Sequence, residues 1–162
     1  MTVTSRSGGA LTRRFDADEL RRALREGRLT GLTGAFEDLV GYRVRHDPAE
    51  GAYLELEVGQ RHLSQYGIAH GGVTLTLLDA AGGVACFLAA PDALRVATIT
   101  LAANFVRGVP PGLVVATARV DGAGGSVAHA SMELRAGGFG GDLLATAAAS
   151  YRLFRDRTTA AG

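Results

Sequence analysis

A single carboxylate interrupts a long apolar segment of this chain. Asp79 is the only Asp or Glu in the sequence IAHGGVTLTLLDAAGGVACFLAA, which runs from Ile68 to Ala90. An unpaired charge buried in protein costs several kcal/mol, so such a segment needs a reason to keep one. Asp79 is therefore a candidate acid, base or nucleophile. The alternative is a structural carboxylate paired with an arginine or a hydroxyl group.

The residues before this apolar run offer a second chemical function. His70, Gly71 and Gly72 form a turn with little side-chain bulk that leads directly into a helical apolar pattern. Free backbone N–H groups at a helix start, together with the positive end of the helix dipole, can bind an anion or polarise a carbonyl group. His70 could take part directly or serve as a helix-entry residue bonded to the backbone.

The elements that must position these groups follow a simple order. Two strands are expected between residues 35 and 58, the second at 53–58, where apolar and charged residues alternate. The apolar helix comes next. Four extended runs follow near 95–106, 112–121, 126–136 and 143–154, separated by Pro- and Gly-rich turns that suit hairpins.

A shorter helix is expected before this domain. Asp16 can cap its N-terminus with Glu19 three residues on, and Leu20, Ala23 and Leu24 form a narrow apolar stripe. This helix is expected to pack on the outside of the domain or to cap its ligand site. The chain thus divides into an N-terminal extension (1–34) with a poorly ordered start at 1–14, one domain (35–156) and a tail (157–162).

A helix that is apolar on all sides must be covered on most of them, and an antiparallel sheet curled around it is the simplest cover. The fold class is therefore α+β: one long central helix wrapped by a curved antiparallel sheet of five to six strands. The glycine pair Gly82-Gly83 in mid-helix is unusual, because each glycine costs up to about 1 kcal/mol there. It either admits a partner helix closely or leaves room for a ligand.

Composition favours an ordinary soluble protein of the cytoplasm. With 162 residues, 47% hydrophobic residues and a net charge of +1, nothing marks a nucleic-acid binder. The single cysteine, Cys86, excludes an intramolecular disulfide and fits a core residue in a reducing compartment. The apolar run contains Asp79 and four glycines without flanking anchors, which favours a helix buried in protein over a membrane span.

The other histidines give no sign of a metal site. His46, His62 and His129 lack ligand spacing with one another or with a Cys or Asp partner, and we interpret them as surface or strand residues. No metal and no separate cofactor is expected.

The chain resembles the hotdog-fold acyl-CoA thioesterases of the phenylacetyl-CoA (PaaI-like) type over roughly residues 35–155. The resemblance is carried by RHLSQYGIAHGG at 61–72, by Leu75, Leu78 and Asp79 on the helix, and by TITLAANFVR at 98–107. It implies that the Gly72 N–H polarises the thioester carbonyl and that Asp79 is the nucleophile or the general base. It also implies that Thr98 lies near that acid, that His70 supports the site, and that coenzyme A enters only as part of the substrate.

Two departures from the family pattern concern substrate contacts. Many relatives have Asn where this chain has Ser64, and the neighbouring Gln65 could replace it. A position that is often basic in relatives is Gly125, so contacts to the coenzyme A phosphates would fall to Arg107 or Arg152. Gly71 completes the set of expected substrate contacts.

Helix geometry tests independently whether one chain can form such a site. Seven residues separate Gly72 from Asp79, which corresponds to about 10 Å and nearly two whole turns. Both residues face the same way, but reacting atoms must approach within about 3 Å. The two groups must therefore come from different subunits, in agreement with the homodimers or homotetramers that the resemblance implies.

Three functions remain open from the sequence. The first is hydrolysis of an acyl-CoA with an aromatic or medium-chain acyl group. The second is a non-catalytic module that binds acyl-CoA, to which Ser64 in place of Asn gives some weight. The third is a hotdog hydratase or dehydratase, in which His70 and Asp79 would have to act on one substrate carbon.

Overall fold

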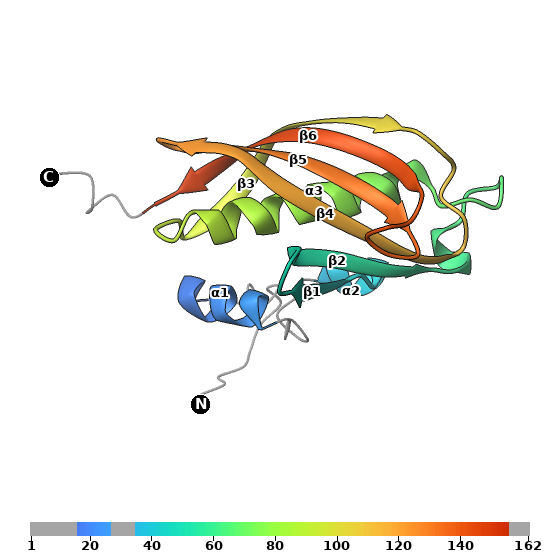
Figure 1. The fold of residues 1–162 in the computed structure, drawn as a ribbon, viewed down its shortest axis with the longest axis horizontal. Coiled ribbons are helices and arrows are strands. Elements are labelled where there is room, and N and C mark those ends of the chain that lie inside the picture. The colour runs from blue at the N-terminus through green and yellow to red at the C-terminus, as the bar shows by residue number, and fades with distance from the viewer. Residues whose placement is uncertain (1–15, 27–34, 156–162) are drawn as a thin grey trace, which may run out of the picture.

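The computed structural model describes residues 16–26 and 35–155. Figure 1 shows a curved sheet arched over one long helix, with two short helices on the opposite side. The elements in chain order are α1 (Ala17–Arg25), α2 (Ala35–Val40), β1 (Arg43–Asp47), β2 (Gly51–Val58), a 3-10 turn (Gln60–His62), α3 (Gly71–Ala89), β3 (Arg95–Phe105), β4 (Gly112–Gly124), β5 (Val127–Ala136) and β6 (Leu143–Phe154). The predicted order, with two strands before the long helix and four after it, is confirmed.

All six strands form one antiparallel sheet in the order β1-β2-β4-β5-β6-β3. The glycine-rich segment 137–142 connects β5 to β6, as predicted. The turn expected at 121–125 is shorter, because β4 continues to Gly124 and pairs with Val127, so that only Gly125 and Ser126 connect β4 to β5. Because β3 crosses over to pair with β6, it lies at one edge of the sheet and β1 lies at the other. The α+β class and the wrapped central helix are as predicted.

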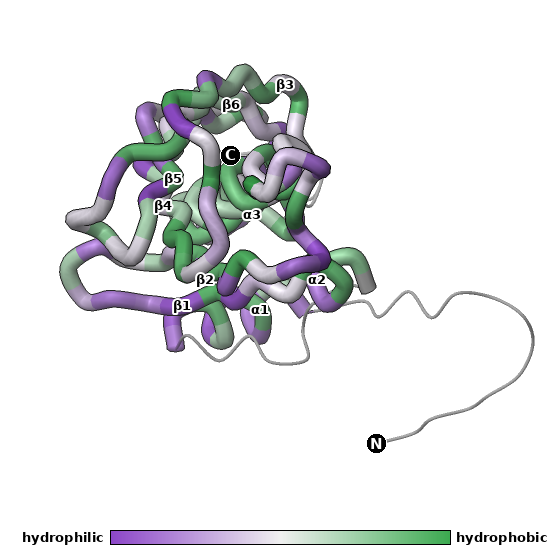
Figure 2. The backbone as a smooth tube through the Cα atoms, turned by 90° about the vertical axis from the view of Figure 1, so that its right-hand side faces the viewer, coloured by the Kyte–Doolittle hydropathy of each residue, from purple (hydrophilic) through white to green (hydrophobic). Residues whose placement is uncertain are grey.

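Helix α3 packs one face against the concave side of the sheet (Figure 2). Leu77, Leu78 and Ala81 are at most 2% exposed on this face. Gly82 is also buried, and Tyr151 and Met132 pack directly on it. A Cβ atom at Gly82 would lie 2.8 Å from Cζ of Tyr151 and 2.9 Å from Sδ of Met132. The first glycine of the pair therefore admits the chain's own strands β5 and β6, not a partner helix.

The rest of α3 is far less covered than its composition requires. Gly71–Ala89 is long and apolar enough to cross a membrane, with a hydropathy of 1.7, yet it is the central helix of this fold. Only 39% of its most apolar window is buried within the chain. A core helix of this apolarity would normally be covered on most sides. Part of its surface is therefore left uncovered by the described residues of this chain.

Helix α1 has the predicted cap and a single strong anchor. The carboxylate of Asp16 accepts hydrogen bonds from the N–H groups of Asp18 and Glu19, each at 3.0 Å. Arg21 is 5% exposed and donates to the carbonyl oxygens of Ala90, at 3.0 Å, and of Ala93. Since Ala90 caps the C-terminus of α3, Arg21 joins α1 to that end of the central helix.

Two features differ from the sequence interpretation. Residues 35–40 form the short helix α2, so the first strand is confined to 43–47. The interpretation of His62 as a surface or strand residue is wrong, because His62 is 5% exposed in the 3-10 turn. Its Nδ1 accepts the Gly59 N–H at 2.9 Å, so Nε2 carries the proton and donates to the Val40 carbonyl at 2.8 Å.

Cys86 is a fully buried core residue, as predicted. Among residues 16–26 and 35–155, no group of three His, Cys, Asp or Glu side chains is arranged to hold a metal ion. The expected disorder of residues 1–14 and the tail at 157–162 lie outside the described residues.

Candidate active site

Asp79 lies on α3 opposite the edge strand β3, and its partner is a hydroxyl group. Thr98 Oγ1 donates to Asp79 Oδ1 at 2.8 Å. The strand has a bulge beside this contact, because Thr98 pairs with Tyr151 whereas Thr100 pairs with Ser150, so that Ile99 is the extra residue. Bulges redirect side chains and are common next to active sites. The structure therefore brings together two of the predicted site residues, the acid and the threonine.

Two tyrosines that the sequence interpretation missed lie close to Asp79. Tyr151 OH donates to the main-chain oxygen of Asp79 at 3.0 Å. Burial raises the pKa of Tyr151, and the charge of Asp79 raises it further. The pKa of Tyr42 is raised by burial and then by the charges of Glu37 and Asp79. Both phenols therefore remain protonated donors at neutral pH, near the carboxylate.

A cavity of about 250 Å³ opens at this carboxylate. Asp79 and Thr98 border it from α3 and β3, Tyr151 borders it from β6, and Tyr42 borders it from the segment before β1. Phe36 and Glu37 approach from α2 on the remaining side. Asp79 is thus a half-buried group open to a small molecule, not a carboxylate sealed in a core ion pair.

The second predicted group, the backbone N–H donors, lies at the start of α3. His70 is the N-cap residue, and its Nδ1 accepts the Gly72 N–H at 3.0 Å. The backbone role that the sequence left open for His70 is thus the one seen in this structure. The ring of Phe105 lies against Gly71, 3.5 Å from the place where a Cβ atom would stand. The end of β3 therefore lies beside the beginning of α3.

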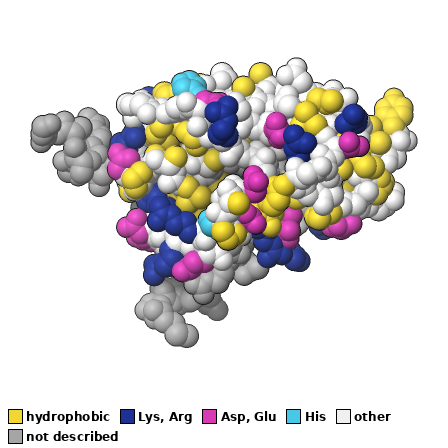
Figure 3. Space-filling model, in the orientation of Figure 1, with side chains coloured by type: hydrophobic (Ala, Val, Ile, Leu, Met, Phe, Trp, Pro, Cys, Tyr) yellow, Lys and Arg dark blue, Asp and Glu magenta, His cyan; other side chains and the backbone are white. Residues whose placement is uncertain are grey.

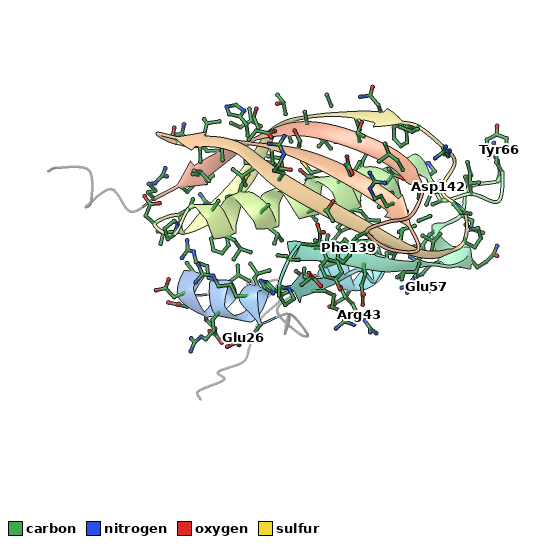
Figure 4. All side chains as sticks on the ribbon, viewed as in Figure 1. Glu26, Arg43, Glu57, Tyr66, Phe139 and Asp142 are labelled. Carbon is green, nitrogen blue, oxygen red and sulfur yellow. The ribbon has the colours of Figure 1, made fainter. Side chains whose placement is uncertain are left out.

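The loop before α3 holds Ser64 in a backbone turn. Ser64 Oγ donates to the Ile68 carbonyl at 3.0 Å and accepts the Tyr66 N–H at 3.3 Å. Gln65 is exposed, and Tyr66 extends from the tip of the loop, away from the body of the domain (Figure 4). The loop shapes the approach to the helix start, and the Ser64 hydroxyl is occupied within it.

The two arginines expected to meet phosphate lie in different places. Arg107 is exposed just after β3, 3.6 Å from a carboxylate oxygen of Asp142 and 3.3 Å from the Leu143 carbonyl. Arg152 is exposed on β6, next to the inward-facing Tyr151. Because neighbouring side chains on a strand point to opposite faces, Arg152 lies on the convex face of the sheet, away from Asp79.

The edge of the sheet beside Asp79 is apolar and open. Among the described residues, β3 pairs only with β6, so its other edge has no strand partner. Ile99 and Phe105 on this strand are 52% and 54% exposed, and Leu75 on the neighbouring face of α3 is 37% exposed. A long apolar edge strand of this kind is a template for pairing with another chain.

Within one chain, this arrangement supplies a base but no N–H donor close enough to polarise the carbonyl group that the base would act on. The carboxylate of Asp79, held by Thr98, could activate water or attack a carbonyl carbon. The N–H groups at the start of α3 lie about 10 Å along the helix from it. The residues are suited to acyl transfer, provided that an assembly brings the start of one α3 beside the Asp79 of another.

Comparison with known proteins shows what this chain is similar to. A model of the thioesterase superfamily matches residues 66–139, the segment that contains Gly72, Asp79 and Thr98. No curated protein sequence matches the chain. Solved structures that are similar to it have the hotdog fold.

A conserved protein from Pseudomonas aeruginosa is 26% identical, with a TM-score of 0.64, and the alignment covers 75% of this chain and 95% of that one. A Bacillus halodurans protein solved with CoA is 19% identical, with a TM-score of 0.72, over 91% of this chain and 99% of that one. The PaaI protein of the E. coli phenylacetic acid degradation operon is 18% identical, with a TM-score of 0.68, over 82% and 94%.

Proposed function

We propose that this chain, a hotdog-fold member of the thioesterase superfamily, hydrolyses an acyl-CoA to the free acid and coenzyme A. The observation that carries the proposal is the Asp79 carboxylate, held by Thr98 and open to a cavity at an unpaired edge of the sheet. A carboxylate in that position can act on a thioester. The CoA that accompanies the Bacillus halodurans relative supports the choice of leaving group.

The active form of the proposed enzyme is a homodimer formed along β3. Along β3, Thr98 lies beside Asp79, and Phe105 lies beside Gly71 at the start of α3. If two copies of β3 pair antiparallel around Leu101 and Ala102, Thr98 of one copy comes opposite Phe105 of the other. Each Asp79 then faces the helix start of the partner subunit, which is the meeting that one chain cannot provide.

The proposed reaction balances without a cofactor. Asp79 takes a proton from water, the water oxygen bonds to the thioester carbonyl carbon, and the C–S bond breaks to release coenzyme A thiolate, which recovers the proton. The Gly72 N–H of the partner subunit donates to the oxyanion, whose oxygen replaces His70 Nδ1 as acceptor. General-base help contributes about 10² to 10⁴-fold and one oxyanion donor about 10² to 10³-fold.

Other predicted residues have supporting places in this scheme. Gln65 and Gly71 border the approach to the carbonyl, with Ser64 shaping their loop. Arg107, two residues after Phe105, is the proposed contact for a coenzyme A phosphate. Arg152 on the convex face can contribute only if dimers associate further into a homotetramer. We place the protein in the cytoplasm, where acyl-CoA substrates occur and a free thiol such as Cys86 stays reduced.

The first test is thiol release from a panel of aryl- and fatty acyl-CoAs. The wild type is expected to release coenzyme A, and Asp79→Asn to lose about 10² to 10⁴-fold in kcat while keeping its thermal midpoint. Asn retains an oxygen to accept the Thr98 bond, so the variant tests charge more than packing. Turnover by Asp79→Asn at the wild-type rate would rule out the mechanism. Stabilisation by acyl-CoA without any hydrolysis would identify a binding module instead.

The second test asks whether the site is shared. Asp79→Asn and Gly72→Pro are each expected to be nearly inactive, because Pro removes the N–H and is tolerated in the first turn of a helix. In a mixed dimer, one of the two sites regains both wild-type groups. Statistical mixing should therefore restore about a quarter of wild-type activity, whereas sites within single chains would regain none.

A further inference from the structure

The cavity at Asp79 adjoins a second one that plays no part in the proposed reaction. This second cavity, of about 280 Å³, lies between the C-terminal half of α3 and helix α1. The two cavities share four lining residues, Glu37, Tyr42, Gly83 and Val96. A molecule whose reacting atom lies at Asp79 can therefore extend directly into the second space.

The walls of the second cavity are those of a pocket for a hydrocarbon chain. Besides the shared Tyr42 and Val96, six aliphatic or aromatic side chains surround it: Leu20, Leu24, Val44, Val84, Phe87 and Leu94. Figure 3 shows hydrophobic side chains at the surface between the sheet and the layer that contains α1. Glu37 and Arg95 also border these spaces, but both are at least partly exposed, so their charged ends can reach water.

Gly83 lines both cavities and lies four residues after Asp79, therefore on the same face of α3. A Cβ atom at Gly83 would stand 3.7 Å from Cε1 of Tyr151 and 3.9 Å from Cγ2 of Val96, which are ordinary contact distances. The second glycine of the pair is thus not required by packing, unlike Gly82. Its missing side chain leaves room where the two cavities adjoin.

Helix α1 closes the far end. Leu20 and Leu24, one turn apart, face the cavity from α1, and Arg21 fixes the helix to Ala90 and Ala93 beyond the end of α3. The Arg21 guanidinium also lies 4.4 Å from the ring centroid of Phe87, another wall residue. The end wall is therefore held in place, and it comes from the N-terminal extension.

We propose that the paired cavities hold a linear medium-chain acyl group, that Gly83 is its passage, and that Leu20 and Leu24 of α1 set its maximum length. The inference rests on the proposed thioesterase function. From Asp79 to Phe87 the helix rises about 12 Å, the length of an acyl chain of roughly eight to ten carbons. An aromatic acyl group would fill the first cavity and leave the second empty.

The experiment measures kcat/KM for straight-chain acyl-CoAs from four to sixteen carbons, together with phenylacetyl-CoA. The wild type is expected to prefer eight to ten carbons, and Leu20→Phe and Gly83→Ala to lose about tenfold or more on these chains while keeping the four-carbon rate. Leu20→Ala should move the optimum to longer chains. Arg22→Ala, on the exposed side of α1, is the matched control and should leave the profile unchanged.

Thermal stabilisation of Asp79→Asn by the same acyl-CoAs reads the pocket without turnover. If nothing is hydrolysed but stabilisation rises to ten carbons and is lost in Leu20→Phe, the proposed function fails and the pocket stands. If hydrolysis occurs but the profile is flat, favours phenylacetyl-CoA, or ignores the Leu20 and Gly83 changes, the pocket is overturned and the thioesterase remains.

Discussion

The two sides of helix α3 have similar composition but different surroundings. One side, with Leu78 and Gly82, is sealed against the chain's own sheet, and Tyr151 and Met132 fill the space above the glycine. The other side, with Asp79 and Gly83, borders the two cavities and, at Asp79, the edge strand β3. Stability therefore resides on the sealed side, whereas the proposed chemistry resides on the side that a second copy must complete.

Placing a charge on the open edge should have the largest effect. Ile99→Asp puts a carboxylate on the exposed strand, where unpaired edges are kept from pairing by such charges. We expect a monomer by sedimentation and a loss of at least about 10²-fold in kcat/KM, since the oxyanion donor leaves with the partner. Ala123→Asp, at an exposed position of β4, is the control. An active monomer would contradict the shared site.

The glycine pair tests the sealed side. Gly82→Ala should destabilise the fold by about 1–3 kcal/mol, because Tyr151 and Met132 are buried and cannot move away from the new methyl group. Gly83→Ala should be neutral or stabilising by up to about 1 kcal/mol, since Ala favours helix and the site has room. Urea midpoints of the two variants measure the contrast. Equal midpoints would show that the two positions are not packed differently.

On the open side, removing the hydrogen bond between Thr98 and Asp79 tests what a single hydrogen bond contributes to activity. Thr98→Val keeps the shape of the side chain and removes the donor at 2.8 Å. We expect kcat/KM to fall about tenfold, which corresponds to about 1.4 kcal/mol at the transition state. The unfolding midpoint should change little, because Thr98 is exposed and water can replace its hydroxyl group as a donor to Asp79. Thr100→Val on the same strand is the control. A shift in stability alone would make Thr98 structural.

The reactivity of a thiol, which changes neither activity nor stability, also tests the sealed side. Burial, with the charge of Asp121 adding to it, raises the pKa of Cys86 from 9.0 to about 11. Because the raised pKa keeps the thiol protonated, the thiolate fraction at pH 8 falls about 100-fold, and alkylation should be slower by at least that factor than in urea. Mass spectrometry of iodoacetamide-treated protein measures the rates. Rapid labelling of the folded protein would show that this side opens readily.

The candidate site divides into parts that the sequence could and could not predict. Asp79 stands out because no other carboxylate shares its segment, and the cap at His70 follows from a turn entering a helix. Tyr151 could have been recognised as inward-facing from the alternation of its strand, but not as the partner of a residue 72 positions earlier. Tyr42 carries no local signal at all, because its role depends on how α2 meets α3.

The sequence by itself determined the order of elements, the helix with its lone acid, the start of that helix and the cap of α1. These depend on the period of apolar residues and on turn and cap chemistry, which act over a few neighbouring positions. Only the tertiary structure decided that Gly82 serves packing whereas Gly83 leaves space, that β3 is an open edge, and that α1 closes the cavity beyond Asp79. Each of these depends on contacts between residues far apart in the chain, whose pairing no local pattern specifies.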